Sequence, residues 1–437
     1  MEVRDATSTV YRVEPEAARA DNDVRSGYKR AEVGVIPNNW DVVAAGSLGK
    51  FRGGNGFPLA YQGKIAGDYP FFKVSDMNNK GNEIEMLVAN NYISDAMRKQ
   101  LGAHAFPATT IIFAKVGAAV FLERKKLLAI PSCIDNNMMG FTITDEGCAF
   151  QYVLYYFLSF SLGSLVSTTA LPSLSGDVLN RIQIPMPPTL AEQQAIAEAL
   201  SDADALIESL QQLIAKQRAL KQGTMQALLT GRQRLPGFTG EWKTVHLGEM
   251  GAFRKGRGIP RSAANTGGLP AVRYGEIYTI HSNYVRSFAT WISEQVAASA
   301  VRITRGDILF AGSGETKEEI GKCIAITQHV VAYAGGDVVI FRPHEGDPLY
   351  YGYALNMPEV NQQKASRGQG DAVVHISTDA LGQLEISVPS VQEQTAIATV
   401  LSDMDAEIEA LEARLAKTRA LKTGMMQQLL TGRIRLV

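Results

Sequence analysis

The sequence has little that points to an enzyme, a membrane protein or a disulfide-linked protein. Cysteine occurs only at Cys133, Cys148 and Cys323 in 437 residues, an odd, scattered set that predicts a reducing, cytoplasmic location without disulfides. No run of 18 apolar residues exists, and the N-terminal stretch is polar with mixed charge. We therefore expect neither a signal peptide nor a membrane span. A formal net charge of −1 argues against a polycation that coats nucleic acid, but it permits a locally basic groove.

Sequence motifs for catalysis are also scarce. The six histidines and three cysteines show no metal-ligand spacing, and the segment 312–317 (GSGETK) lacks the second glycine of a phosphate-binding loop. Asp307, Glu315 and Lys317 faintly resemble a nuclease D…ExK arrangement, but the first half of the chain has no matching carboxylates. We expect a solvated loop there, no bound cofactor and a chain that is not an enzyme.

What the sequence does contain is a long internal repeat. Residues 188–235 recur as residues 389–436 at a constant offset of 201, and 30 of the 48 aligned positions are identical. Agreement at polar as well as apolar positions indicates a true duplication.

Each copy of the repeat predicts a long helix. Residues 189–192 and 390–393 have the spacing of a capping box, and Gly231 and Gly432 supply a stop. About 40 residues at ~1.5 Å per residue give a helix of roughly 60 Å. Apolar residues spaced alternately by four and three predict a coiled-coil seam. The seam comprises Ile196, Leu200, Ile207, Leu210, Ile214, Ile397, Leu401, Ile408, Leu411 and Leu415.

The charges favour an antiparallel pair. In each copy the acidic residues come first and most basic residues follow, which suits the helix dipole. A parallel pair would place acid against acid, whereas an antiparallel pair places acid against base.

The duplication includes the parts between the helices. Trp40 and Trp242 open segments that agree at several Gly, Phe, Arg and Pro positions, followed by short β-rich runs. The expected fold class is mixed α/β (α+β), with two globular target-recognition domains separated by two long helices in an antiparallel coiled coil. The expected boundaries are a loose arm (1–37), domain 1 (38–188), a helix (189–235), domain 2 (236–389) and a second helix (390–437).

Basic residues in glycine-rich or polar loops are the candidate DNA contacts. Glycine lets a backbone approach phosphate closely, and arginine binds phosphate or guanine edges in bidentate fashion. Each residue taken singly also fits an ordinary soluble turn. The candidates are Arg254, Lys255, Arg257 and Arg261 in FRKGRGIPR, Lys50 and Arg52 in the first copy, Lys73 and Arg273 in matching short runs, and Lys364 and Arg367 in NQQKASRGQG.

A second set of apolar residues follows the coiled-coil seam in each helix. Packing on the chain's own domains is the plainer explanation, and a docking face for partner subunits is the alternative. The residues are Leu220, Met225, Leu228, Leu229, Leu421, Met426, Leu429 and Leu430.

These motifs together resemble the specificity subunit of type I restriction–modification systems. The resemblance rests on IPNNW at a domain start, IPMPPTLAEQQAIAEAL entering a long helix and LKQGTMQALLTGRQRL leaving it, with the last two repeated in the second copy. It covers nearly the whole chain after residue 37.

The resemblance implies a chain that reads double-stranded DNA without catalysing a reaction. Each domain would read one half of a split site, and the helices would fix the gap and bind two methyltransferase subunits. Up to two restriction (motor–nuclease) subunits would join them. S-adenosylmethionine, ATP and Mg would be bound by those partner subunits, not by this chain.

Two alternatives remain open at this point. One is a DNA-binding enzyme with its own nuclease or methyltransferase activity, and the other is a coiled-coil scaffold that joins proteins without reading DNA.

Overall fold

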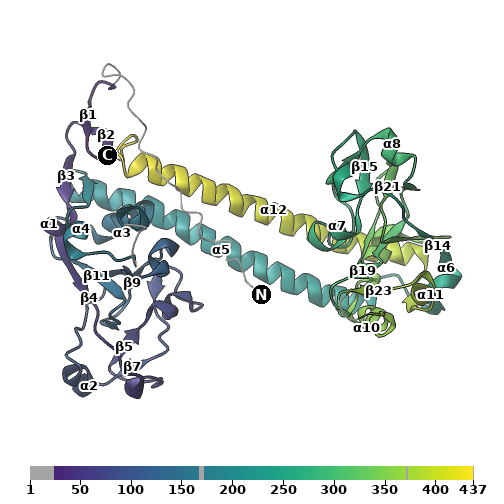
Figure 1. Cartoon of the computed structure of the whole chain (residues 1–437), viewed down its shortest axis with the longest axis horizontal. Helices are drawn as coiled ribbons and strands as arrows, with labels where there is room; N and C mark the ends of the chain where they lie inside the picture. The colour runs from purple at the N-terminus through teal and green to yellow at the C-terminus, as the bar shows by residue number, and fades with distance from the viewer. Residues whose placement is uncertain (1–23, 167–171, 371–372, 437) are drawn as a thin grey trace. The chain divides into compact units, whose positions relative to one another are not determined.

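Two compact units make up the chain in a computed structural model that describes residues 24–166, 172–370 and 373–436. Unit 1 comprises Met1–Ser209 and Arg414–Val437, and unit 2 comprises Leu210–Ala413. Two long helices, α5 (Leu190–Leu229) and α12 (Val391–Leu429), each contribute residues to both units (Figure 1). No helix among the described residues is long and apolar enough to cross a membrane.

A five-stranded sheet in unit 1 separates two hydrophobic cores. On one face Phe51, Phe113 and Phe141 pack against Phe157 of helix α3 (Phe150–Ser159). On the other face Ile112 packs with residues of a smaller sheet and its loops. The strand order is β4 (Gly49–Gly53), β11 (Met138–Ile143), β8 (Ile111–Ala114), β9 (Lys125–Leu128), β6 (Glu85–Met86), and the smaller sheet is β10 (Cys133–Ile134), β5 (Tyr69–Phe72), β7 (Tyr92–Ile93).

Short elements complete unit 1. They are the pairs β1 (Tyr28–Ala31) with β2 (Gly34–Pro37) and β3 (Asp41–Ala44) with β12 (Gln183–Met186), the helices α1 (Ala45–Leu48), α2 (Asp95–Gln100) and α4 (Gly176–Asn180), and the 3-10 turns η1 (Leu59–Tyr61), η2 (Val74–Asn78), η3 (Ala118–Leu122) and η4 (Leu162–Leu165).

Unit 2 is built on the same plan with different contents. Its antiparallel sheet packs Phe253, Phe310 and Phe341 toward α9 on one face, and Leu309 and Ile340 toward a second sheet on the other. The first sheet is β14 (Gly251–Lys255), β22 (Val338–Pro343), β18 (Ile308–Ala311), β20 (Cys323–Ala325), and the second is β16 (Thr290–Ile292), β15 (Leu269–Val272), β21 (Ala332–Ala334), β17 (Val301–Ile303). The remaining elements are β13 (Lys243–His246) with β24 (Glu385–Val388), β19 (Ser313–Gly314) with β23 (Val374–His375), α6 (Leu247–Met250), η5 (Arg261–Ala263), α7 (Tyr274–Thr279), α8 (Glu294–Ala297), α9 (Pro348–Ala354), α10 (Pro358–Arg367) and α11 (Thr378–Gly382).

The strand register confirms that the globular parts are duplicated. In unit 1 Phe51 lies opposite Phe141, and in unit 2 Phe253 lies opposite Phe341. The edge order β4-β11-β8 is matched by β14-β22-β18, and the pair β3–β12 by β13–β24. The predicted mixed α/β fold with an internal duplication is therefore confirmed.

The expected loose arm is partly wrong. Residues 1–23 lie outside the described residues, but residues 28–37 form the β1–β2 hairpin. Tyr28 donates hydrogen bonds of 3.2 Å to the carbonyls of Gly432 and Arg433, and Ile36 is buried in the core of unit 1. The hairpin is ordered because it packs on the end of α12.

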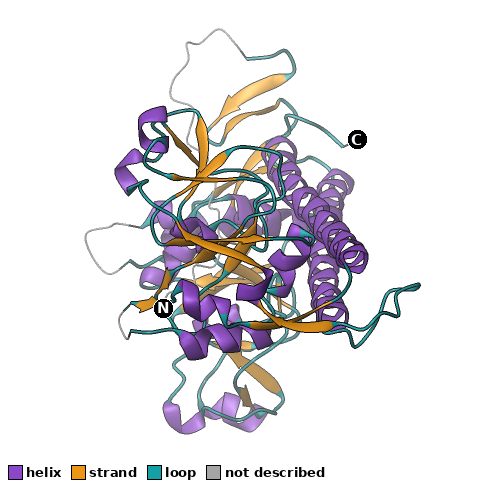
Figure 2. Ribbon diagram, turned by 90° about the vertical axis from the view of Figure 1, so that its right-hand side faces the viewer, coloured by secondary structure: helices purple, strands orange, loops and turns teal. Residues whose placement is uncertain are grey.

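The two long helices lie side by side (Figure 2) and pair in the antiparallel sense (Figure 1). In unit 1 the ammonium of Lys422 lies 2.6 Å from Asp204, and the guanidinium of Arg435 binds Glu192. Positions that advance along α5 thus meet positions that recede along α12, and in unit 2 Lys221 pairs with Asp405 at 2.5 Å. The prediction of acid against base is confirmed in each unit.

The helix starts use only half of the expected capping box. The hydroxyls of Thr189 and Ser390 accept hydrogen bonds from the backbone N–H groups of Glu192 and Glu393. The carboxylates do not reach back to the cap. The carboxylate of Glu393 instead accepts two hydrogen bonds from Arg234, at 2.5 and 2.6 Å. The acidic residue therefore joins the start of one helix to the end of the other.

Candidate nucleic-acid interface

Edge strands β4 and β14, together with the loops that follow them, carry six of the ten predicted DNA contacts. Alternate residues of a strand face opposite sides, and Phe51 and Phe253 point into the cores. Their neighbours therefore point the other way, and Lys50, Arg52 and Arg254 are exposed. The strands thus display these cations because their aromatic residues anchor the opposite face.

The loops after the edge strands require glycine at one matching position. A Cβ atom added to Gly54 would lie 2.0 Å from the carbonyl oxygen of Asp135, and one added to Gly256 would lie 2.0 Å from that of Gly335. Backbone cannot yield to such contacts, so only glycine fits. In both units the loop lies directly against the neighbouring chain segment.

The end of each loop is held by a buried or stacked apolar residue. Ile259 adopts a left-handed backbone conformation (φ 57°) and is buried, and Phe57 stacks on Phe71 with ring centroids 3.9 Å apart. A left-handed β-branched residue is strained and persists only where its surroundings hold it. The loop in unit 2 is therefore rigidly anchored while Lys255, Arg257 and Arg261 stay exposed.

Lys73 and Arg273 occupy equivalent places at the starts of short helical turns. Their backbone N–H groups donate to Asp76 and Glu276, three residues on. Lys73 also donates a 3.0 Å hydrogen bond to Gln62. Both side chains are half-buried, so they have a local structural role in addition to any DNA contact.

Lys364 was wrongly predicted as a surface DNA contact. It lies within helix α10, not in a loop, and its buried ammonium donates to the carbonyls of Gly321 (2.8 Å) and Leu355 (2.9 Å). Burial lowers its pKa to about 8. Arg367, at the end of the same helix, is half-buried and donates to the carbonyls of Gln363 and Gln383.

Most of the apolar residues predicted to dock partners are used within the chain. Leu228 and Leu229 lie in the core of unit 2, and Leu429 and Leu430 lie in the core of unit 1. Met225 and Met426 pack against the same cores. These six residues cannot form an exposed docking face. Leu220 and Leu421, at equivalent positions, are exposed by 55% and 62%.

The predicted seam is buried to different degrees along its length. Ile196, Leu200, Ile397 and Leu401 belong to the domain cores, and Leu210, Ile214 and Ile408 are also buried. Ile207, Leu411 and Leu415 are half-buried. The ends of the helices therefore serve the globular cores as well as each other.

A repeated group of three residues fastens each globular part to both helices. In unit 1 the hydroxyl of Tyr155 donates to Asp204, and Lys422 lies over the same tyrosine ring. In unit 2 Tyr353 donates to Asp405, and Lys221 lies over its ring. The tyrosine could not be found from sequence, because it comes from a different segment that the fold brings to the helix pair.

The helix-end arginines are a second repeated feature. Arg435 lies over the ring of Trp40 (5.8 Å) and Arg234 over that of Trp242 (5.6 Å). Each arginine also binds the glutamate at the start of the other helix, as described above. The one sequence signal was that these arginines and glutamates recur at the same offset.

The aspartate of the D…ExK resemblance forms a structural ion pair and is not part of a nuclease site. Asp307 is buried, and both its oxygens accept hydrogen bonds of 2.6 Å from Arg342. Glu315 and Lys317 are exposed in the following loop. Among the described residues no group of three or more His, Cys, Asp or Glu side chains could hold a metal ion.

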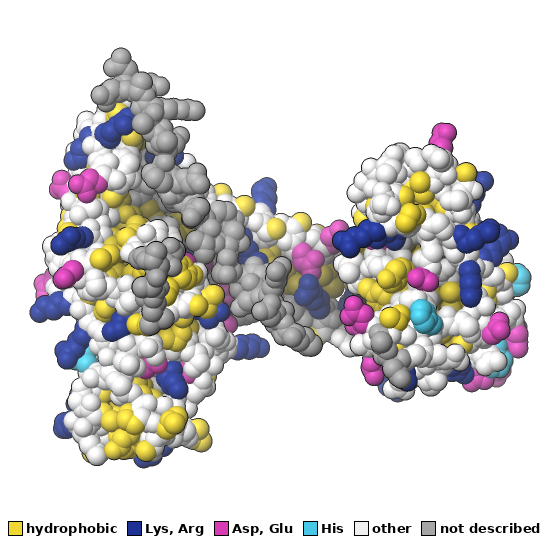
Figure 3. All heavy atoms as spheres, viewed as in Figure 1, with side chains coloured by type: hydrophobic (Ala, Val, Ile, Leu, Met, Phe, Trp, Pro, Cys, Tyr) yellow, Lys and Arg dark blue, Asp and Glu magenta, His cyan; other side chains and the backbone are white. Residues whose placement is uncertain are grey.

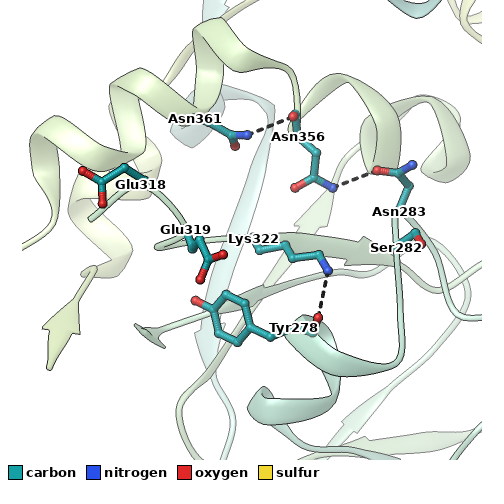
Figure 4. A pocket seen from close by; sticks show the side chains of 8 residues that line it. All are labelled: Tyr278, Ser282, Asn283, Glu318, Glu319, Lys322, Asn356 and Asn361. Carbon is teal, nitrogen blue, oxygen red and sulfur yellow. Dashed lines mark hydrogen bonds between the residues drawn. The ribbon is translucent and has the colours of Figure 1, made fainter. Parts of the chain in front are cut away.

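One open cavity of about 520 Å³ lies in unit 2 (Figure 4). It is lined by Tyr278, Ser282, Asn283, Glu318, Glu319, Lys322, Asn356 and Asn361. The ammonium of Lys322 donates to the backbone carbonyl of His281 (2.8 Å), and the side-chain amide of Asn356 donates to the side-chain Oδ1 of Asn283 (3.2 Å). These groups bind one another and form no nucleophile–base arrangement.

Charged side chains are mixed over the visible surface. On the face shown in Figure 3, Lys and Arg alternate with Asp and Glu in both units and do not gather in one continuous patch. On this face, positive charge is therefore presented by separate local groups.

Two domains with one frame, each joined to the same pair of helices, define a duplicated recognition-type architecture. The family model of the type I restriction modification DNA specificity domain matches residues 37–216 and 239–418. The chain therefore belongs to this family and carries two copies of its domain.

Known proteins agree with this assignment along the chain. The specificity subunit of the type I restriction enzyme MjaVIII from Methanocaldococcus jannaschii is 22% identical over 427 residues, covering 92% of this chain and 94% of the relative. The MjaIX specificity subunit of the same organism is 26% identical over 186 residues, 42% of each chain.

Solved structures share the fold. The crystal structure of a type I restriction–modification S subunit from M. genitalium has a TM-score of 0.57 at 16% identity, covering 90% of this chain and 96% of that one. A chain from a structure on complex assembly and conformational transition of the type I system has a TM-score of 0.54 at 15% identity, covering 91% and 99%.

Proposed function

We propose that this DNA specificity subunit reads a split duplex site, with each recognition domain contacting one half. The observation that carries the proposal is the contrast within the duplication. The two long helices agree at 30 of 48 positions, whereas the loops after β4 and β14 share their glycines but differ in their cations. Because the two reading surfaces differ, the two half-sites should differ, which gives an asymmetric bipartite target.

The paired helices would set the distance between the half-sites. Each domain is fastened to both helices by its own Asp–Lys–Tyr group and by its own Glu–Arg pair. A change in helix length would then change the spacer without touching the residues that read bases. Two domains on one face of B-DNA would enter grooves about one helical turn apart, roughly 34–36 Å.

Catalysis would come from partner subunits. The family resemblance implies two methyltransferase subunits that bind S-adenosylmethionine, and up to two motor–nuclease subunits that use ATP and Mg. The methyltransferase subunits would dock along the helices, where Leu220 and Leu421 present equivalent exposed apolar side chains. This chain would supply recognition and assembly without a catalytic site.

The test is a matched extension of both helices. Seven residues, two helical turns that preserve the apolar seam, are inserted into α5 between Asp204 and Lys221 and into α12 between Asp405 and Lys422. All four ion-paired residues keep their partners, and each helix lengthens by about 10 Å. The methylation target mapped in cells should have a longer spacer and the same two half-sites. The control is an insertion in α5 alone, which moves the ion-paired residues of the two helices out of register. A change of base preference within a half-site would contradict the proposal that the helices set only the spacer.

A further inference from the structure

A lysine lies beside the end of the first edge strand in both units, but different strands supply it. In unit 1 Gly53 lies at the end of β4, and a Cβ atom added there would be 2.5 Å from the ammonium nitrogen of Lys115. Lys115 follows strand β8, so its side chain crosses β11 to reach the edge strand. In unit 2 the residue that matches Gly53 is Lys255.

The strand register establishes the match without any sequence alignment. Gly53 lies opposite Met139, which lies opposite Phe113, and Lys255 lies opposite Val339, which lies opposite Phe310. Two residues after Phe113 comes Lys115, and two residues after Phe310 comes Gly312.

The backbone hydrogen bonds confirm that these last two positions are equivalent. Lys115 donates to the carbonyl of Asn137 at 2.8 Å, just before β11. Gly312 donates to the carbonyl of Asp337 at 2.7 Å, just before β22. Unit 1 therefore has glycine on the edge strand and lysine on the inner strand, and unit 2 has lysine on the edge strand and glycine on the inner one.

No contact among the described residues explains this exchange. Within the described residues no hydrogen bond or ion pair holds the ammonium of Lys115 or Lys255. Lys115 is half-buried and Lys255 is exposed, and among the described residues the fold gives the lysine ammonium of neither unit an anionic partner. The repeated presence of a lysine beside a glycine-rich loop instead suits an external anion, since such loops let a phosphate approach the backbone.

We propose that Lys115 in unit 1 and Lys255 in unit 2 are equivalent contacts to a DNA backbone phosphate. The inference rests on the proposed function and deepens it. Each domain would hold its half-site by a phosphate contact at one fixed point, next to base-reading residues that are free to differ.

The test exchanges the lysine and glycine within unit 1. Full-length chain, alone and assembled with methyltransferase subunits, is titrated with a duplex carrying the methylation target mapped in cells and with a shuffled duplex, at several salt concentrations. Lys115→Gly should weaken binding to both duplexes about threefold to tenfold and reduce the slope of log K against log salt by about 0.9. Adding Gly53→Lys to Lys115→Gly should restore both quantities, because the ammonium then comes from the edge strand.

Controls separate this contact from folding and from the wider proposal. Lys99→Met removes an exposed lysine that is already paired with Asp95, and it should leave the salt slope unchanged. Lys255→Gly should reproduce the loss in unit 2. If Lys115→Gly binds with unchanged affinity and slope, or if the double variant stays weak while its thermal unfolding matches wild type, the inference is wrong. If wild-type chain shows no preference for the mapped target even with its partners, the proposed function itself fails.

Discussion

The ion pair between Asp405 and Lys221 allows the helix–domain junction to be tested quantitatively. Its two side chains are only 13% and 14% exposed and lie 2.5 Å apart. Asp405 also accepts a hydrogen bond from the hydroxyl of Tyr353, and its carboxylate lies 3.7 Å from the guanidinium of Arg286. Removing one partner of a buried pair costs about 3–5 kcal/mol. The remaining exposure reduces our expectation for Asp405→Asn to about 2–3 kcal/mol of unfolding free energy.

The second unit provides a matched comparison. Asp204 and Lys422 form the same pair with Tyr155, at 2.6 Å and with similar exposure. No described residue takes the place of Arg286 there. Lys422→Met should therefore destabilise unit 1 more than Lys221→Met destabilises unit 2, because Asp405 keeps a second cation. The exposed pair Arg218–Glu412, with 64% and 43% exposure, is the control and should contribute about 0.5 kcal/mol.

The assay is a double-mutant cycle on the full-length chain. Asp405→Asn, Lys221→Met and the double variant are unfolded in urea, and hydrogen-exchange mass spectrometry follows peptides of each unit separately. A coupling energy of about 2 kcal/mol is expected for the buried pair. A coupling no larger than that of Arg218–Glu412 would refute the view that these groups fasten the domains to the helices.

Two further predictions concern single residues. Arg254→Ala and Arg257→Ala should each weaken DNA binding of the complete complex by about 1–3 kcal/mol if they read base edges. Replacement of the exposed Lys243 by alanine is the control and should not weaken binding. Unchanged affinity and specificity of the arginine variants would exclude the segment that carries Arg254 and Arg257 from the interface. Burial lowers the pKa of Lys364 to about 8 from the usual 10.5, so the unfolded chain binds more protons than the folded chain between these values. The free energy of unfolding should therefore rise with pH from about 8 to 10.5, by up to about 3 kcal/mol from this group, and fall no further below pH 8. Lys364→Met should lack this rise in urea titrations, and an identical pH profile in both proteins would contradict the assignment.

Features that repeat along the chain could be predicted from sequence. The helices, their antiparallel sense and the stops at Gly231 and Gly432 depend on local spacing and charge order. Both copies of the repeat have this spacing and this order. Both stop glycines do adopt left-handed backbone, at φ 70° and 68°. Lys50, Arg52 and Arg254 were candidate contacts from sequence, and all three are exposed in the structure.

Features that depend on which segments meet could not be predicted. Lys364 looks like a surface cation in NQQKASRGQG, and only the packing of α10 shows that two carbonyls hold it inside. Leu228 and Leu429 look like a docking face until the cores that receive them are known. Lys115 could not be identified from sequence, because its neighbour Gly53 is 62 residues away and comes close only through the strand order β4-β11-β8.

The proposed function requires that this chain alone determines which duplex sites its complex methylates. The most direct measurement maps methylated adenines across the genome in cells with and without the gene, and again with the residue 38–188 domain exchanged for that of a relative. We expect one asymmetric bipartite motif that disappears without the gene and whose one half changes with the exchanged domain while the spacer stays constant. A methylation pattern that is the same with and without the gene would contradict the account.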